Sequence, residues 1–246
     1  MTHGAKWAKA MLLAKLKSSA TRQEFEAFFL DDRCGSGVAH DAVSAARCVL
    51  MHSSEIAGLP HQVLMADSPA PFDAVYQLTS PDMDSPAILG KGIQQVVEQL
   101  NDWIDRSASA LFVGAEITIT RGDGPIGIIM PLRRRRGMSH DDFMHDWFVR
   151  HAALSEDAGG IPYRQNHVDA DATRRLCRAT GITSEEIDGV TEAFFSTAEE
   201  ARNAMSQPQV ANEAIEDEKR FIDHGRSQFG FYRIARRPVF SRRSLP

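Results

Sequence analysis

The sequence predicts an α+β protein made of two copies of a βαββαβ unit, at about residues 1–120 and 121–246. The first observation is a repeat: Thr21 begins TRQEFEAFF as Ser139 begins SHDDFMHDWF, at an offset of 139 minus 21, or 118. The second is that strand-like and helix-like apolar patterns follow one another in the same order in each half. The third is that the strand expected at 188–195 is apolar on both faces, as in a sheet covered on both sides.

Aromatic and apolar positions extend this repeat. At the offset of 118 the matched pairs are Phe25 with Phe143, Phe29 with Trp147, and Trp103 with Phe221. In the middle strands the offset is taken as 115, which pairs His52 with His167, Val75 with Val190 and Cys48 with Tyr163. A gap of three residues between the helices and these strands accounts for the difference.

The first half is expected to begin with a strand at 8–17 and a helix at 21–33, where Phe25, Phe28 and Phe29 recur at helical spacing. Strands follow at 45–54 and 72–79. The stripe from Ile93 to Ile104 predicts a second buried helix, and ALFVGAEITI at 110–119 closes the unit as a strand.

The second half repeats the pattern after the turn TRGDGP at 120–125. Strands are expected near 126–134, 161–169, 188–195 and 227–237. Helices are expected near 139–155 and 197–223, the latter broken around Pro208. An insertion at 170–187 is expected to hold a short helix at 173–178.

Composition excludes several classes of protein. With 43% hydrophobic and 25% charged residues, the chain has ample material for one or two cores. The net charge of -5 argues against a nucleic-acid surface, and the run Arg133–Arg136 is expected to be a solvated turn. Three cysteines without CxxC spacing predict free thiols. Without an apolar run of membrane length or a secretory leader, we expect a cytoplasmic protein that does not bind membranes.

Known catalytic motifs are missing from the sequence. It has no GxGxxG after a strand, no P-loop, no GxSxG and no HExxH, so we expect no cofactor. His140, His145 and His151 are five and six residues apart and do not share a helical face, which makes a metal site on this helix improbable.

The residues at the start of the second half nevertheless predict a candidate site. Ser139 is expected to cap a helix on which Phe143, Trp147 and His151 recur at spacing four and share a face. After the break at Gly159 and Gly160, the side chains of Tyr163, Gln165 and His167 share one face of a strand. A lone buried histidine more often has a structural role. Two histidines beside a tyrosine indicate acid–base chemistry about as strongly as they indicate a structural role.

The first half lacks this combination. Arg33 corresponds to His151 at the offset of 118, and an arginine stays protonated where a histidine exchanges protons. We therefore expect the chemistry in the second half, with Arg33 a surface residue or an anion contact. Glu192, within an apolar strand, is expected to be buried with a raised pKa or else to pair with an arginine at a barrel rim, and burial is favoured.

The motifs RRRRGMSHDDF, WFVRHA, YRQNHV and IDGVTEAFF together resemble the EthD family of dimeric α+β barrels, over residues 126–240. This resemblance implies two ferredoxin-like units that form a barrel within one chain, an internal pseudo-dimer. It implies cofactor-independent proton transfer, ring closure, dehydration or decarboxylation on a small aromatic, polyketide-like or lactone compound. The family's catalytic residues carry over to His151, His167 and Tyr163. Substrate-binding side chains are expected at Phe143, Trp147, Glu192 and Phe194.

A lyase or isomerase is the preferred function class. One alternative is a cofactor-free monooxygenase in which Phe143 and Trp147 hold an electron-rich phenol. A second alternative is a binding protein that catalyses nothing, in which the histidines only satisfy a polar seam. The substrate and any further homodimer stay open.

Overall fold

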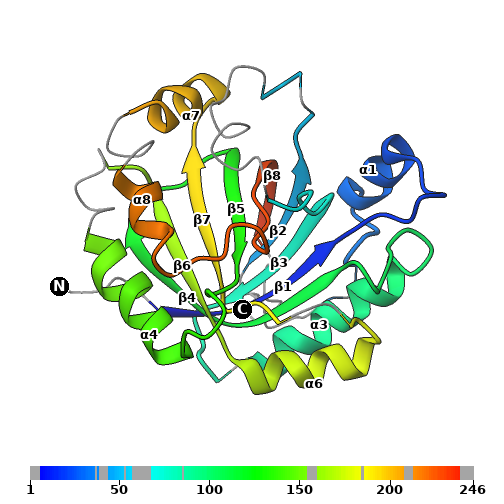
Figure 1. The fold of residues 1–246 in the computed structure, drawn as a ribbon. Helices are drawn as coiled ribbons and strands as arrows, with labels where there is room; N and C mark the ends of the chain where they lie inside the picture. Colours follow the sequence, from blue (N-terminus) through cyan, green and yellow to red (C-terminus); the bar gives the residue numbers. More distant parts are fainter. Residues whose placement is uncertain are drawn as a thin grey trace, which may run out of the picture.

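The computed structural model describes residues 6–36, 38, 44–52, 54–56, 68–84, 86–153, 160–183, 186–207 and 213–238, and Figure 1 shows its fold. The elements before residue 121 are β1 (Lys6–Ala14), α1 (Arg22–Leu30), β2 (Ser44–Leu50), β3 (Ala74–Ser80), α3 (Pro86–Gln99) and β4 (Ala110–Thr120). Those that follow are β5 (Ile126–Leu132), α4 (His140–Met144), the π-helix η1 (His145–His151), β6 (Tyr163–Val168), α6 (Ala170–Thr180), β7 (Gly189–Phe195), α7 (Ala198–Met205), α8 (Ile215–Glu218) and β8 (Gly230–Pro238).

The eight strands form one closed antiparallel barrel in the order β1-β3-β2-β8-β5-β7-β6-β4. Within the first half the neighbours run β4-β1-β3-β2, and within the second half β8-β5-β7-β6, so the same order occurs twice. The pairs β2·β8 and β4·β6 join the halves. Closure leaves no strand edge unpaired, which removes the usual site of edge-to-edge aggregation.

Strand alternation divides the side chains between the barrel lumen and the surrounding helices. An eight-stranded barrel is narrow enough for side chains to fill its interior. The apolar part of the lumen is built by both halves and includes Met11, Leu13, Cys48, Val75, Phe112, Ile129, Val190 and Tyr232.

The helices lie outside the barrel wall (Figure 1), and two further cores fill the space between them and the barrel. In the first half, Phe25 and Phe29 of α1 and the apolar stripe of α3 pack on the outer face of the barrel. In the second half, Phe143, Trp147 and Phe221 fill the corresponding space. No described helix is both long and apolar enough to cross a membrane.

The predicted element order is confirmed, with differences in detail. The helix expected over 197–223 is present as α7 and α8, and the residues around Pro208 lie outside the described part. The helix expected at 173–178 is longer, because Asp169 caps it at its N-terminus and Gly181, with φ of 69°, ends it. Cys34, Cys48 and Cys177 are free thiols, as expected.

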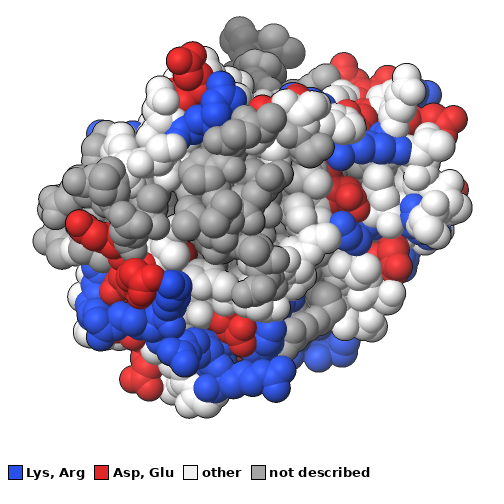
Figure 2. Space-filling model, turned by 45° about the horizontal axis from the view of Figure 1, so that its top comes forward, with Lys and Arg blue, Asp and Glu red and all other residues white. Residues whose placement is uncertain are grey.

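The arginine run is only partly a solvated turn. Arg133 is 4% exposed, and its Nη1 donates to the carbonyl of Arg226 and to Gln228. Arg134 pairs with Asp188, whereas Arg135 and Arg136 are exposed. On the face shown in Figure 2, basic side chains gather along the lower edge with acidic ones among them.

Candidate active site

The site begins at the helix that follows β5. The Ser139 side chain accepts a hydrogen bond from the backbone N–H of Asp142 at 3.1 Å, as a helix cap does. The Asp142 carboxylate bonds the Ser139 hydroxyl at 2.6 Å, instead of the backbone amide that a capping box would use. The cap is thus confirmed, with a different reciprocal contact.

After one α-helical turn the helix widens into the π-helix η1. Its backbone bonds reach five residues back: the N–H of Ala152 donates to the carbonyl of Trp147. Phe143 and Trp147 are fully buried with their ring centroids 5.4 Å apart, and His151 is 7% exposed. The predicted apolar face that ends in an imidazole is present. Isolated π-helical turns occur often at functional sites.

The strand β6 presents Tyr163, Gln165 and His167 to this helix. The hydroxyl of Tyr163 accepts from Trp147 Nε1 at 3.1 Å and from Gln165 Nε2 at 3.2 Å. Gln165 Nε2 also donates to the carbonyl of Trp147 at 3.0 Å. Because a carbonyl only accepts, the amide of Gln165 has a fixed orientation, with its Oε1 turned to His167. His167 Nε2 lies 3.1 Å from that Oε1 and therefore donates to it.

Two aromatic rings enclose His167. Its ring centroid lies 5.3 Å from that of Trp147 and 4.8 Å from that of Phe148, the latter edge-on. Gly189 on β7 allows Trp147 to approach this closely, because a Cβ there would lie 2.3 Å from the indole ring.

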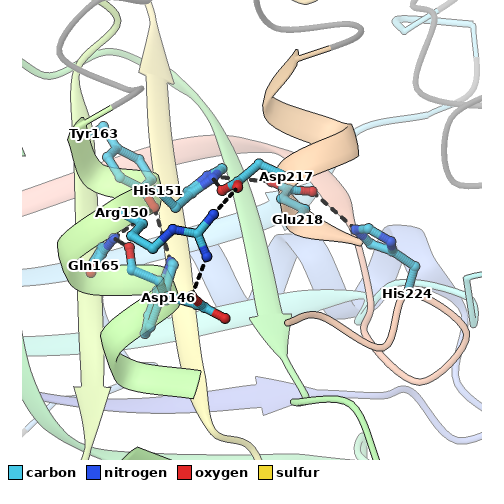
Figure 3. A network of polar contacts seen from close by, with 9 residues as sticks. Asp146, Arg150, His151, Tyr163, Gln165, Asp217, Glu218 and His224 are labelled. Carbon is cyan, nitrogen blue, oxygen red and sulfur yellow. Dashed lines mark hydrogen bonds and ion pairs between the residues drawn. The ribbon is translucent and has the colours of Figure 1, made fainter. Parts of the chain in front are cut away.

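His151 contacts a separate group of side chains on and after α8 (Figure 3). Its Nδ1 lies 3.1 Å from Asp217 Oδ2, and its Nε2 lies 3.8 Å from Glu218 Oε1. The ring meets Phe221 edge-on, with centroids 5.5 Å apart. Glu218 also bonds His224 Nε2 at 3.0 Å.

Arg150 ties this group to the π-helix. Its Nη1 donates to Asp146 at 2.6 Å, and its Nη2 lies 3.3 Å from Asp217 Oδ1. Asp217 is therefore held by Arg150 on one oxygen and by His151 on the other (Figure 3). A carboxylate that accepts from Nδ1–H fixes the tautomer of a histidine and leaves Nε2 as its basic nitrogen.

The phenol of Tyr163 is protonated at neutral pH. Burial raises its pKa to about 12, although hydrogen bonds from Thr191, Gln165 and Trp147 act in the opposite direction. Tyr163 therefore stays a neutral hydrogen-bonding group throughout the physiological range.

The structure divides the seven predicted site residues between two faces of the sheet. His167, Tyr163, Phe143 and Trp147 lie outside the barrel wall, where the helix packs on it, and His151 lies between the same helix and α8. Glu192 and Phe194 are on the lumen side of β7, on the face of Val190. They cannot share one site with the others, because the sheet separates them.

Even within the outer group the two histidines have different surroundings. His151 contacts Asp217 and Glu218, whereas His167 contacts Gln165, Trp147 and Phe148. Tyr163 and His167 are four residues apart on one strand, which corresponds to roughly 13 Å. That both imidazoles reach one substrate stays a prediction.

The expected pKa of Glu192 was wrong, although its burial is confirmed. Burial acts to raise this pKa, but the Lys9 and Arg164 charges and hydrogen bonds from Lys9 and Gln77 outweigh it. The pKa of Glu192 therefore lies below its ordinary value. The lysine comes from the other half of the chain, so the local sequence around Glu192 gave no sign of it.

The comparison between the halves also needs correction. Cys48 faces the lumen and pairs with Val75, and the residue that pairs with Val190 is Asn166. Since 166 minus 48 is 118, Cys48 corresponds to Asn166 and not to Tyr163. By the same register His167 corresponds to Val49, whereas His52 is an exposed residue beyond the end of β2. Arg33 is exposed and pairs with Asp31 at 2.9 Å, as the surface interpretation had it.

The side chains that surround His151 were not foreseen. Asp217 and Glu218 carried no separable signal, because they stand in the charged run EDEKR, which is typical of a solvated helix face. Arg150 is a single arginine in WFVRHA and gave no sign of its contact with Asp217. Among the described residues, no group of three or more histidine, cysteine, aspartate or glutamate side chains has an arrangement that could hold a metal ion.

Comparison with known proteins tests the resemblance to the EthD family. The model of the EthD domain matches residues 135–225. The matched stretch lies in the second half and includes His151, His167, Tyr163 and the α8 carboxylates. No curated protein matches the sequence.

Solved structures share the fold of the whole chain. A candidate monooxygenase from Fusobacterium nucleatum subsp. nucleatum has a TM-score of 0.52 at 9% identity, over 97% of this chain and 96% of its own. A protein described as a candidate chlorite dismutase has a TM-score of 0.50 at 10% identity, over 94% of this chain and 96% of its own. The chain thus shares an α+β barrel fold with these structures, and its barrel has eight antiparallel strands.

Proposed function

We propose that this protein is an enzyme that moves a proton on a small organic substrate, as a lyase or isomerase, with His151 as the acid–base group. The observation that carries the proposal is the contact of 3.1 Å between His151 Nδ1 and Asp217 Oδ2 in a nearly buried setting. A histidine whose tautomer is fixed by a carboxylate is suited to take a proton on Nε2 and return it.

The surroundings of His151 support a general acid–base role more than a purely structural one. Its ring nitrogens face Asp217 and Glu218, and both carboxylates have further charged or titratable partners: Arg150 contacts Asp217, and His224 contacts Glu218. Clusters of coupled titratable groups occur more often at functional sites than in structural cores. Glu218, 3.8 Å from Nε2, is a second candidate proton carrier.

We also propose that the chain is a tandem pair of ferredoxin-like units in which only the second, residues 121–246, keeps the site. The repeated strand order and the offset of 118 support a duplication. The loss of the site from the first unit is supported by Arg33, whose side chain is 77% exposed where the second unit has His151 buried. The resemblance to EthD proteins directs the choice of substrate to aromatic, polyketide-like or lactone compounds.

The test is a screen of aromatic acids and lactones in deuterated buffer, followed by NMR for product formation and for exchange of carbon-bound hydrogen. We expect conversion or exchange with the wild type and with His145→Gln, an exposed histidine on the same helix, and its loss in His151→Gln. Conversion that His151→Gln leaves unchanged would overturn the proposal.

The same screen separates the alternatives. The candidate monooxygenase among proteins of this fold makes oxygen the obvious second variable, so each compound is tested with and without oxygen. A reaction that consumes oxygen would identify the cofactor-free oxygenase. Saturable binding without conversion under either condition would identify a binding protein.

A further inference from the structure

We propose a second binding site, for a small carboxylate anion, in the mouth of the barrel lumen at the N-terminal end of β1. This site lies on the opposite face of β6 and β7 from His151, because Arg164 and Asn166 alternate along β6 with Tyr163, Gln165 and His167. It is therefore independent of the proton-transfer function.

The mouth of the lumen contains a cavity of about 230 Å³. Its lining is polar, unlike the apolar lumen below it. The lining side chains include Trp7, Lys9, Gln77, Thr79, Glu116 and Arg164, with Ser44, Ala46 and Thr118 beside them. These residues alternate with outward-facing ones along β1, β2, β3 and β4, so their side chains converge on one space.

A buried ion cluster forms the floor of this cavity. Lys9 is 1% exposed and bonds Glu116 at 2.7 Å and also Glu192. Glu192 accepts further bonds from Gln77 at 2.6 Å and Asn166 at 2.9 Å. Strands of both halves contribute to this cluster, which is the main polar feature of an otherwise apolar lumen.

A contribution to folding stability does not by itself explain why the lumen contains this ion cluster. Apolar side chains of similar volume usually serve a barrel interior as well as a buried ion group does, because the charges must be desolvated. The cluster is also not fully paired, since the buried Oδ1 of Asn166 has no partner among the described residues. An ammonium has three donors, and within the described chain Lys9 uses two of them, on Glu116 and Glu192.

Arg164 is the side chain best placed to take a ligand. Its guanidinium lies 4.4 Å from the centre of the Phe194 ring, and its Nη2 donates to the carbonyl of Gly122 at 3.1 Å. The nearest carboxylates, Glu116 and Asp123, are both 3.7 Å away. Charge-assisted bonds are typically about 2.7–2.9 Å long, so Arg164 is positioned but has donors left for a carboxylate.

Charge and size define the ligand class. Among the described residues, Lys9, Arg164 and Glu116 line the cavity and Glu192 lies at its floor, so these four charges balance. The preference for an anion comes from the remaining donors of Arg164, whose planar fork matches a carboxylate in a bidentate contact. The volume corresponds to about eight water molecules at roughly 30 Å³ each, enough for an anion the size of benzoate. The indole of Trp7 at the rim offers such a ring an apolar face.

The experiment is calorimetric titration of the full chain with benzoate and with benzamide, its uncharged analogue of nearly the same shape. We expect saturable binding of benzoate and much weaker binding of benzamide. Arg164→Gln should weaken benzoate binding roughly tenfold or more, because it removes a charged hydrogen-bond partner. Arg33→Gln, which makes the same change of charge at an exposed position outside the cavity, should bind benzoate as the wild type does.

A second variant keeps the test decisive if Arg164→Gln does not fold. Ala46→Leu leaves every charge in place and fills the cavity, so it should also abolish benzoate binding. Absence of saturable binding to the wild type, equal binding of benzamide, or undiminished binding by either Arg164→Gln or Ala46→Leu would overturn the proposal. None of these outcomes bears on His151, whose role is read from turnover.

Discussion

The Nδ1 atom of His151 lies 3.1 Å from the Oδ2 atom of Asp217, a residue 66 positions further along the chain. The contact joins the end of the π-helix to α8, and Arg150 holds the other carboxylate oxygen. Asp217 is therefore a positioning residue for His151 in the proposed mechanism.

Asp217→Asn tests this positioning role. An amide can present either a donor or an acceptor to Nδ1, so the tautomer of His151 is no longer fixed. We expect turnover to fall by about tenfold to a hundredfold with little change in KM. Glu216→Gln, on the same helix but exposed and paired with Lys219, is the matched control and should keep full turnover. Equal effects of the two changes would remove Asp217 from the mechanism.

Much of the fold could be predicted from the sequence because periodic signals repeat in it. The positions of Phe25 and Phe143 at one offset, and strands of alternating or two-sided apolar character, were enough to place all eight strands. The register was harder. The true correspondence of Cys48 with Asn166 depends on which residues pair across strands, and a gap of three residues in the alignment hid it.

The candidate site was predictable only where its residues are close in sequence. Tyr163, Gln165 and His167 were correctly placed on one strand face, because that requires only the period of two. Glu192 was grouped with them wrongly, because alternation does not say which face of β7 meets the helix. The contact of Asp217 with His151 depends on the path of the chain through α7 and α8, which no local pattern records.

The tyrosines give a prediction on pH dependence. The chain has three, and burial raises the pKa of Tyr76 and of Tyr163 to about 12 and that of Tyr232 higher still. We expect the folded protein to show no phenolate absorbance at pH 10 to 11, whereas in denaturant all three ionise near pH 10. The measurement is a spectrophotometric titration with and without denaturant. A phenolate signal from folded protein near pH 10 would contradict the burial of these side chains.

The raised pKa values of the tyrosines also make the folding stability depend on pH. A raised pKa in the folded state stabilises the protein fully below the unfolded value, near 10, and this stabilisation is lost as the pH rises through about 12. Alkaline unfolding should therefore begin above pH 10. Tyr163→Phe should reduce this dependence, and it should cost about 1–3 kcal/mol at pH 7 because Trp147 Nε1 and Gln165 Nε2 lose an acceptor.

Glu192 gives the opposite dependence. Its folded pKa is lowered, because the Lys9 and Arg164 charges outweigh the desolvation that acts to raise it. The stabilisation is present above the unfolded value, about 4.3, and is lost as the pH falls below it. Glu192→Gln should destabilise the protein by roughly 3–5 kcal/mol at pH 7 and flatten the acid limb, since Lys9 loses one of its two carboxylates.

Denaturant unfolding between pH 7 and pH 3 measures this effect. Glu186→Gln, an exposed glutamate paired with Arg174, is the control and should change stability by about 1 kcal/mol or less. A stability of Glu192→Gln equal to that of the control would show that the buried cluster contributes nothing to folding.

Two glycines test the packing around Trp147. Gly189→Ala would place a Cβ 2.3 Å from the indole ring, and we expect a loss of about 1–3 kcal/mol in the free energy of unfolding. Gly90→Ala, within α3 and with no atom inside 4 Å of the added Cβ, should stabilise the protein by about 0.5–1 kcal/mol. Chemical denaturation of both variants checks the pair, and destabilisation of similar size in each would argue against the close contact of Trp147 with β7.

The most direct test of the central claim is the turnover of His151→Ala, measured against wild type and against His52→Ala across pH 5 to 9 on the substrate that the screen identifies. A general acid–base group contributes about 10²–10⁴-fold in rate. We therefore expect His151→Ala to lose about that factor and the pH dependence of turnover with it. His52→Ala, an exposed residue of the first half, should retain both. Unchanged turnover and an unchanged pH profile in His151→Ala would contradict the account.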